Sequence, residues 1–370
     1  MMNSLKIIFG FLFSSSLLFG QNNKIVAKFQ LDNKLAIERI SESVEIPSSI
    51  IKKIKGKKFL IKESTAQKEI PYQLLTNGNL LVQVDFKSNE KKNVDIIVGN
   101  PSIYESKVYG RFVPERYDDF AWENDQIAFR MYGKALEKNP NQNAWGTDVW
   151  SKRTNKMVID KWYKLDNYHQ DNGEGLDFFK VGNSLGSGDI LPFVDNQFVY
   201  LGNYSDYKIL ENGPIRFSFE LYYPQTEKNG YKIYLTKKIS LDAGSQLNKV
   251  EVTYHFENQK TLTVFAGIVH WNENGKKTIN SKEHFASYWP NETKEGIVGT
   301  AILFPNREDM IIDIQEHLGI KTDLKSNETI TYYTGAAWNK AEEITNEKEW
   351  NDYLTNFSER LTSPILIKKR

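Results

Sequence analysis

The chain has 370 residues, 40% of them hydrophobic and 26% charged, which is enough for one large domain or two ordinary ones. Its formal charge of +1 provides no basic field for nucleic acid and no polybasic patch for a membrane surface. Any anionic substrate must therefore be held by a local site. The chain contains no cysteine, which excludes disulfides, thiolate metal sites and a lipid-anchored cysteine.

The first twenty residues, MMNSLKIIFGFLFSSSLLFG, have one lysine followed by an apolar run that is too short to span a membrane. This pattern is typical of a secretory signal peptide. No later segment is long and apolar enough to cross a membrane. We therefore expect residues 1–20 to be removed and the protein to be exported, soluble and periplasmic.

The pattern of the remaining sequence predicts mainly β-strands. Residues 24–100 alternate in short runs such as KIVAKFQL and LLVQVDF, and residues 197–265 repeat the pattern in runs of about 8–12 residues. Between them, residues 105–190 are dense in Gly, Asn, Asp and Trp, which predicts long structured loops. Only residues 345–361 favour a helix. We expect an all-β fold, a large antiparallel sandwich with few helices, in which residues 21–100 pack on a catalytic domain of residues 101–370.

One stretch in the loop-rich region, ERYDDFAWENDQIAFR (115–130), concentrates charge beside aromatic rings. Arg116 and Asn124 are our candidates for gripping a substrate carboxylate, because a guanidinium fork and an amide both donate hydrogen bonds. Trp122 is a candidate for stacking on a sugar, and Asp119 and Glu123 for orienting the other groups. The alternative is a structural network of ion pairs, which explains three further members equally well: Asp118, Asp125 and Arg130.

A second stretch, NYHQDNGEGLDFF (167–179), contains a histidine among Gly, Asn and Asp. We expect His169 to act as base or acid, with Tyr168 as its counterpart, and Asp171 to orient them. The acidic residues of this stretch could instead wrap a divalent cation, although their spacing does not match an EF-hand loop. The cofactor prediction is therefore none, with a divalent metal as the alternative.

Two further motifs carry candidates. In GTDVWSK (146–152), Asp148, Trp150 and Lys152 alternate, so a strand would point all three the same way, as a sugar subsite requires. A tryptophan at the rim of the sandwich explains this motif equally well. His270 follows an apolar strand in GIVHW and is the second candidate for the counterpart of His169. No P-loop, HExxH or helix-opening GxGxxG motif occurs.

Together, PERYDDFAWENDQIAFRMYGKAL, GTDVWSK, YHQDNGEGLDFFKVGNSLGSGD and HW resemble, in order, an exported family of formerly unknown function from bacterial polysaccharide-utilisation systems. One class of this family is the ulvan oligosaccharide dehydratase. The resemblance covers about residues 30–360. It implies a galactose-mutarotase-like super-sandwich and a substrate that is a sulfated oligosaccharide with a non-reducing-end glucuronic or iduronic acid. The implied product is a 4,5-unsaturated uronic acid.

The candidate residues suit this elimination. Neutralising the carboxylate makes the C5 proton acidic, a base removes that proton, and an acid protonates O4 as it leaves. Three other functions stay open: an endo-acting polysaccharide lyase, a glycoside hydrolase with a carboxylate pair, and a non-catalytic periplasmic glycan-binding protein.

Overall fold

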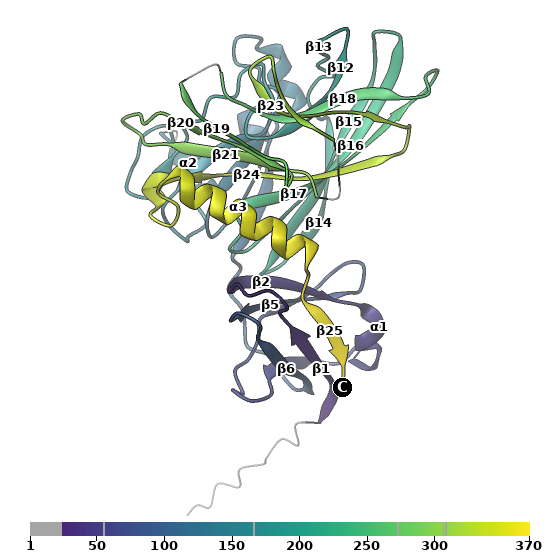
Figure 1. The fold of residues 1–370 in the computed structure, drawn as a ribbon, viewed down its shortest axis with the longest axis vertical. Coiled ribbons are helices and arrows are strands. Elements are labelled where there is room, and N and C mark those ends of the chain that lie inside the picture. The colour runs from purple at the N-terminus through teal and green to yellow at the C-terminus, as the bar shows by residue number, and fades with distance from the viewer. Residues whose placement is uncertain (1–23, 55, 166, 272–273, 306, 308) are drawn as a thin grey trace, which may run out of the picture.

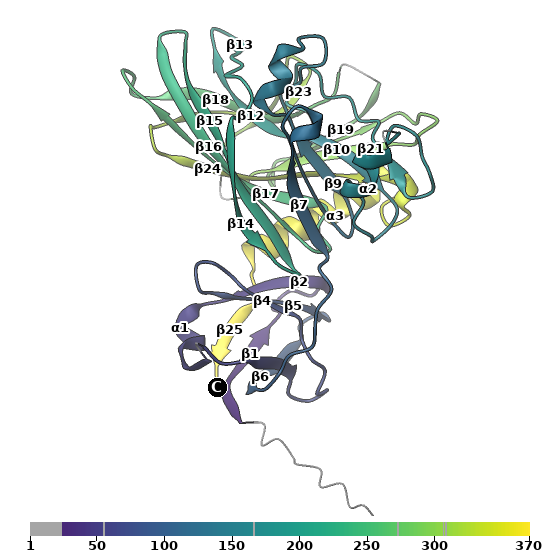
Figure 2. The same ribbon diagram turned by 180° about the vertical axis from the view of Figure 1, so that it is seen from behind.

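The computed structural model describes residues 24–370 except residues 55, 166, 272–273, 306 and 308. The predicted signal peptide, residues 1–20, lies outside the described residues. Figures 1 and 2 show a smaller lobe, which holds the first strands and the C-terminus, below a larger β lobe. Within the described part of the chain, no helix is long and apolar enough to cross a membrane.

The smaller lobe is built from two antiparallel sheets around its own apolar core. One sheet has the order β25 (Leu366–Lys369), β1 (Ile25–Asp32), β6 (Lys91–Val98) and β3 (Phe59–Glu63). The other has the order β2 (Arg39–Ile46), β5 (Leu80–Phe86) and β4 (Tyr72–Leu74), and the short helix α1 (Ser48–Ile51) follows β2. The predicted division at residue 100 stays a prediction. It places the last strand, β25, in the second domain, whereas β25 pairs with β1 of the smaller lobe.

The larger lobe is centred on an eight-stranded antiparallel sheet. Its order is β14 (Asp206–Asn212), β15 (Arg216–Lys228), β16 (Tyr231–Asp242), β17 (Leu247–Phe256), β24 (Thr329–Trp338), β21 (Val298–Leu303), β20 (Phe285–Pro290) and β19 (Gly275–Asn280). Strand β16 illustrates how these strands turn one face toward the core. Its odd-numbered residues from Ile233 to Leu241 are buried and, apart from Lys237, apolar, while the even-numbered ones face outward.

Two five-stranded sheets cover the inner face of this sheet. The first has the order β11 (Gly175–Leu176), β10 (Asp148–Lys152), β9 (Ala128–Met131), β8 (Asp119–Asn124) and β7 (Val108–Val113). The second has the order β13 (Gln197–Phe198), β12 (Asp189–Val194), β18 (Leu262–Val269), β23 (His317–Leu324) and β22 (Ile311–Ile314). Residues of all three sheets form one continuous core. The predicted large antiparallel β super-sandwich is confirmed.

Two longer helices complete the lobe. Helix α3 (Glu347–Thr362) is the helix predicted from the sequence; Asn346 caps it by accepting a hydrogen bond from the Glu349 N–H. Its buried residues Trp350 and Leu354 pack on the outer face of the large sheet, where Figure 1 shows α3 running across the strands. Helix α2 (Ile159–Leu165) covers the face of β8–β10 that points away from the core.

Candidate active site

A buried arginine, Arg130, lies where the three charged segments of the sequence meet. Strand β9 places it between β8 and β10, opposite Ala121 on one side and Asp148 on the other. Its neighbours Phe129 and Met131 point into the main core. Alternation along the strand therefore turns Arg130 toward the opposite face, under α2 and the segment that follows it.

Three carboxylates surround the Arg130 guanidinium. Its Nε donates to Asp148 Oδ2 at 2.9 Å, and its Nη2 donates to Asp177 Oδ2 at 3.0 Å. Its Nη1 lies 3.8 Å from Asp119 Oδ2, beyond hydrogen-bond distance. We call these four residues, together with Arg116, the Arg130 cluster. The cluster brings residues far apart in the sequence into one ionic network.

Aromatic rings enclose the guanidinium. The rings of Tyr132, Trp150 and Tyr168 have their centroids 5.2, 5.3 and 5.9 Å from Arg130 Cζ. These distances are typical of cation–π contacts. Tyr163 adds a hydroxyl that donates to Asp119 Oδ2 at 3.4 Å. The cluster is thus held in a low-dielectric setting, where unpaired charge is costly.

Burial governs the protonation of the carboxyl groups. It raises the pKa of Asp119 to about 7, because the loss of hydration outweighs the attraction of Arg130 and Arg116. Burial also raises the pKa of Asp148 and of Asp177. Three carboxyl groups share two guanidinium groups, so full ionisation would leave an uncompensated negative charge. Asp119 is therefore placed to exchange a proton near neutral pH.

Three buried polar atoms of the cluster have no hydrogen-bond partner among the residues that the structure describes: Arg116 Nη1, Arg130 Nη1 and Asp119 Oδ1. Two are guanidinium donors and one is a carboxyl oxygen. Buried polar groups are usually paired, because each unpaired one costs about 1–3 kcal/mol. The arrangement offers donors for an anion beside a carboxyl group that can accept or give a proton.

The backbone beside Arg116 is strained. Tyr117 and Asp118 both have left-handed φ angles, 52° and 63°, which are uncommon for residues other than glycine. Gly133 permits this turn, since a Cβ there would overlap the Asp118 carbonyl. The Tyr204 hydroxyl donates to the same carbonyl. Consecutive strained residues held by neighbouring groups are typical of functional sites.

The 167–177 segment brings the predicted histidine to the edge of the cluster. Tyr168 is buried and stacks on Trp150 at 5.1 Å. His169 Nδ1 lies 2.9 Å from the Asp177 carbonyl oxygen, while the side chain stays 67% exposed. Asp171 lies further out, where it pairs with Arg153 and accepts a hydrogen bond from the Gly173 N–H at 2.8 Å. His169 is thus accessible next to buried acidic groups, and Asp171 braces its loop.

The structure contradicts the predicted sugar-binding roles of two tryptophans. Trp122 is 1% exposed, packs on Phe129 in the main core and donates from Nε1 to Asn248 Oδ1 at 2.7 Å. Trp150 is fully buried between Tyr168 and Trp162. Neither ring offers a face to a sugar, because other aromatic side chains pack against each of them.

Three polar candidates are also structural. Lys152 Nζ donates to Glu123 Oε2 at 2.7 Å in a fully buried ion pair. Glu123 accepts hydrogen bonds from the N–H groups of Val158 and Ile159 and so caps the start of α2. Asn124 uses its amide entirely on backbone groups, donating to two carbonyls and accepting from two N–H groups. These hydrogen bonds leave none of the three free to bind a substrate.

His270 does not join His169. It lies at the end of β18, where its Nε2 is 2.9 Å from Asp313 Oδ1, and Asp313 also pairs with Lys277 at 2.8 Å. Of the predicted catalytic and binding residues, the structure therefore gathers Arg116, Asp119, Asp148, Tyr168 and His169.

The sequence motifs do not predict Arg130 as the centre of the cluster, or the places of Tyr132 and Tyr163 beside it. One signal was available: Arg130 and Tyr132 alternate on a short strand with Ala128, so the three share a face. As for metals, the described residues contain no group of three or more Asp, Glu or His side chains arranged to hold an ion.

Comparison with known proteins gives the family and the fold. An α-mannosidase from Enterococcus faecalis V583 superposes with a TM-score of 0.50 at 10% identity, over 93% of this chain and 46% of that one. A glycosyl hydrolase family 38 protein from Enterococcus faecalis gives 0.51 at 10% identity, over 93% and 47%. This chain spans less than half the length of either protein, and the likeness concerns the fold alone.

Sequence relatives are more informative. A protein of Formosa agariphila named "Uncharacterized protein P7" is 31% identical over 364 residues, which cover 90% of this chain and 91% of that protein. A family described as a domain of unknown function (DUF4861) matches residues 31–367. The chain belongs to the DUF4861 family.

Proposed function

We propose that this protein is a carbohydrate-active lyase, an oligosaccharide dehydratase. It would remove water from the non-reducing-end glucuronic or iduronic acid of ulvan-type oligosaccharides and leave a 4,5-unsaturated uronyl residue. The motif resemblance supports this substrate, and the sandwich shared with two glycoside hydrolases is compatible with a glycan ligand. We also propose that the protein is exported to the periplasm, as its first twenty residues predict.

The observation that carries the proposal is the set of unpartnered atoms in the Arg130 cluster. A uronic acid presents a carboxylate beside ring hydroxyls. The unpartnered Nη1 atoms of Arg116 and Arg130 are suited to the carboxylate, and Asp119 Oδ1 is suited to a hydroxyl. These atoms supply the charge and the types of donor and acceptor that we propose a uronic acid uses.

The reaction then follows from proton positions. Pairing with the guanidinium groups neutralises the carboxylate and stabilises the enolate-like charge that develops when the C5–H bond breaks. His169, exposed at the edge of the cluster, takes that proton. The electron pair forms the C4–C5 double bond, the C4–O4 bond breaks, and O4 leaves as water with a proton from Asp119, whose pKa of about 7 suits an acid. Tyr168 is the alternative acid.

The test is to incubate the protein with saturated, uronic-acid-terminated ulvan oligosaccharides and to record mass and near-ultraviolet absorbance. Loss of one water together with a gain of absorbance supports the proposal. Absorbance with a fall in polymer length indicates an endo-acting lyase, new reducing ends without absorbance indicate a hydrolase, and binding without product indicates a glycan-binding protein.

Variants assign the roles. His169→Ala should lower the rate of product formation at least about 100-fold, the usual contribution of a general base. His255→Ala is the matched control, because His255 stacks on Tyr234 on the outer face of the large sheet, away from the cluster. Arg116→Lys keeps the charge but loses the fork, so it should also lower the rate. Full activity of His169→Ala would remove that residue from the mechanism.

A further inference from the structure

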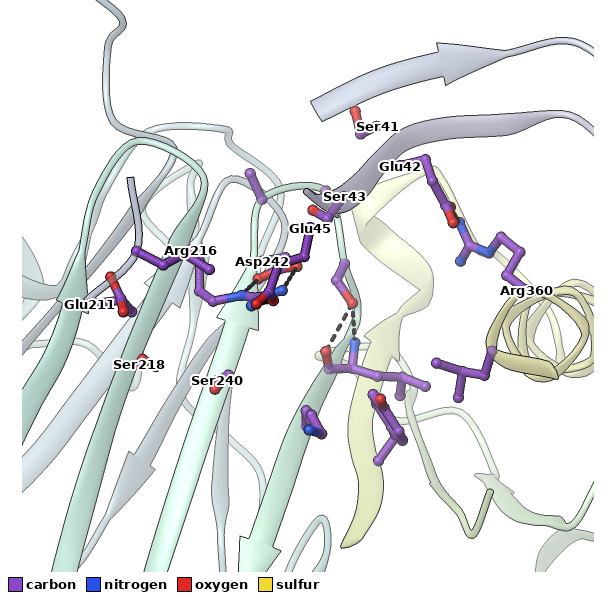
Figure 3. A pocket seen from close by; sticks show the side chains of 18 of the residues that line it. Ser41, Glu42, Ser43, Glu45, Glu211, Arg216, Ser218, Ser240, Asp242 and Arg360 are labelled. Atoms are coloured by element: carbon purple, nitrogen blue, oxygen red, sulfur yellow. Dashed lines mark hydrogen bonds and ion pairs between the residues drawn. The ribbon is translucent and has the colours of Figure 1, made fainter. Parts of the chain in front are cut away.

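A cavity of about 500 Å³ lies between the two lobes, separate from the Arg130 cluster. Figure 3 shows its floor, the outer face of β15 and β16, with β2 of the smaller lobe above it and α3 at its side. The volume falls within the roughly 300–1,000 Å³ of small-molecule sites. Residues of both lobes and of the C-terminal helix line it, so it exists only in the assembled fold.

The floor is made of small hydroxyl residues between charged rows. Ser218 and Ser240 face each other across β15 and β16. The neighbouring pair toward the smaller lobe is Arg216 and Asp242, joined by two hydrogen bonds of 2.6 and 2.8 Å. Because serine is short, the floor is hollowed between its bulkier neighbours. Figure 3 shows both serines on the floor beside the Arg216–Asp242 pair.

Direct contacts between the lobes hold the cavity in shape. Gln73 of β4 donates to the Arg216 carbonyl and accepts hydrogen bonds from the N–H groups of Ile215 and Arg216. Gln83 of β5 donates to the Ala243 carbonyl at 2.9 Å. Gly244, with a φ of +75°, lets β2 approach, since a Cβ there would lie 2.9 Å from that of Ser41. A site that is already formed loses little entropy when it binds a ligand.

The cations that line the cavity are already paired, while Glu211 accepts hydrogen bonds from Thr76. Arg216 also binds Glu45 at 3.2 Å, and Arg360 binds Glu42 at 3.3 Å. Lys238 and Lys249 both bind Glu251. No cation among these four is free for an anion. The remaining hydrogen-bonding capacity belongs to hydroxyl groups and second lone pairs, which suit a neutral polyhydroxylated ligand.

Two further features point to a sugar. The hydroxyl oxygen of Ser43, which lines the roof, is buried without a hydrogen-bond partner among the described residues. On the wall, Tyr333 and Phe357 form a pair of rings 5.3 Å apart. Tyr333 lies in the same row of the sheet as Ser240, with Lys249 between them, so an aromatic surface borders the hydroxyl-rich floor. Such a combination suits the apolar face and the hydroxyl groups of a sugar ring.

We infer that this interlobe cavity is a second carbohydrate-binding site, which takes about one or two neutral sugar rings. It uses none of the residues of the Arg130 cluster, so it does not depend on the proposed elimination. A neutral segment of a glycan held here would keep the protein on its polymer independently of any reaction.

The test uses the whole chain and a panel of neutral trisaccharides, namely xylotriose, cellotriose and mannotriose, with calorimetric titration as the measurement. At least one should bind, and Ser240→Tyr, which fills the floor, should weaken its affinity more than about tenfold. Thr253→Tyr is the matched control, because Thr253 lies on the same outer face but outside the cavity, and it should leave the affinity unchanged.

Three results would overturn the inference: no trisaccharide binds the wild-type chain, binding survives intact in Ser240→Tyr, or sodium sulfate competes with the trisaccharide. If Ser240→Tyr fails to fold, Ser43→Ala provides the same comparison, since it only removes the unpartnered hydroxyl. If the wild-type chain binds a trisaccharide but shows no dehydratase activity, the proposed function is refuted and this site still stands.

Discussion

Asp119→Asn should change how the stability of the protein depends on pH. Asp119 is fully buried, and one of its oxygens has no hydrogen-bond partner among the described residues. Burial raises the pKa of its carboxyl group from 3.8 to about 7. The folded state therefore holds this proton more tightly than the unfolded state does. Asparagine has nearly the same shape and no proton to lose, so it removes this dependence alone.

The sign and size follow from proton linkage. Between about pH 4 and pH 7 the folded state binds more protons at Asp119 than the unfolded state, so the free energy of unfolding falls as pH rises through this window. One pKa unit corresponds to about 1.4 kcal/mol, so the whole rise of the Asp119 pKa corresponds to about 4 kcal/mol. About 3 kcal/mol of this falls between pH 5 and pH 8.

Guanidinium chloride unfolding at pH 5 and pH 8 measures the effect. Relative to the wild-type protein, Asp119→Asn should gain about 3 kcal/mol between the two pH values. Asp206→Asn is the control, because Asp206 is exposed at the start of β14, and it should gain nothing. Equal pH dependence in Asp119→Asn and the wild type would refute the assigned ionisation of the cluster.

Three further predictions concern stability and use denaturant unfolding. Lys152→Met leaves a buried carboxylate unpaired and should cost about 3–5 kcal/mol; a cost under about 1 kcal/mol would contradict the ion pair. Trp122→Ala should cost about 3–5 kcal/mol, because it opens a cavity in the main core, and a near-neutral change would contradict that packing. Gly188→Ala should cost clearly more than Gly173→Ala: both positions have positive φ, but only at Gly188 would a Cβ overlap Thr334, so equal costs would contradict the close approach.

Local patterns predicted the elements of the fold better than their connections. The strands predicted within residues 197–265, β16 among them, and the helix predicted over residues 345–361 are properties of short windows, and both are confirmed. The pairing of β25 with β1 joins segments more than 300 residues apart, through a strand of four residues, LIKK. No local pattern encodes such a partner, because any short alternating strand could take that edge.

The candidate site shows the same limit. The three motifs around residues 119, 148 and 169 each contribute a residue to the Arg130 cluster or its edge. The sequence did not indicate which face of β8 would carry the polar groups, because both faces are covered: the main core lies on one side and the aromatic rings under α2 on the other. The sequence therefore predicts a sugar contact for Trp122 and a structural ion pair for Arg130, whereas the strand register places Arg130 opposite Asp148 at the centre of the cluster.

The choice of Asp119 as the acid rests on its difference from the other two carboxyl groups. Asp148 and Asp177 are tied to Arg130 by hydrogen bonds of 3.0 Å or less, so a proton on either would weaken the contacts that hold the cluster. Asp119 lies 3.8 Å from the guanidinium and keeps Oδ1 without a partner among the described residues. A bound uronate would add a further negative charge to three carboxyl groups and two guanidinium groups, which favours a proton in the cluster. Asp119 makes no hydrogen bond to Arg130, so a proton on it would weaken none of the contacts that hold the cluster, and we therefore propose Asp119 as the acid.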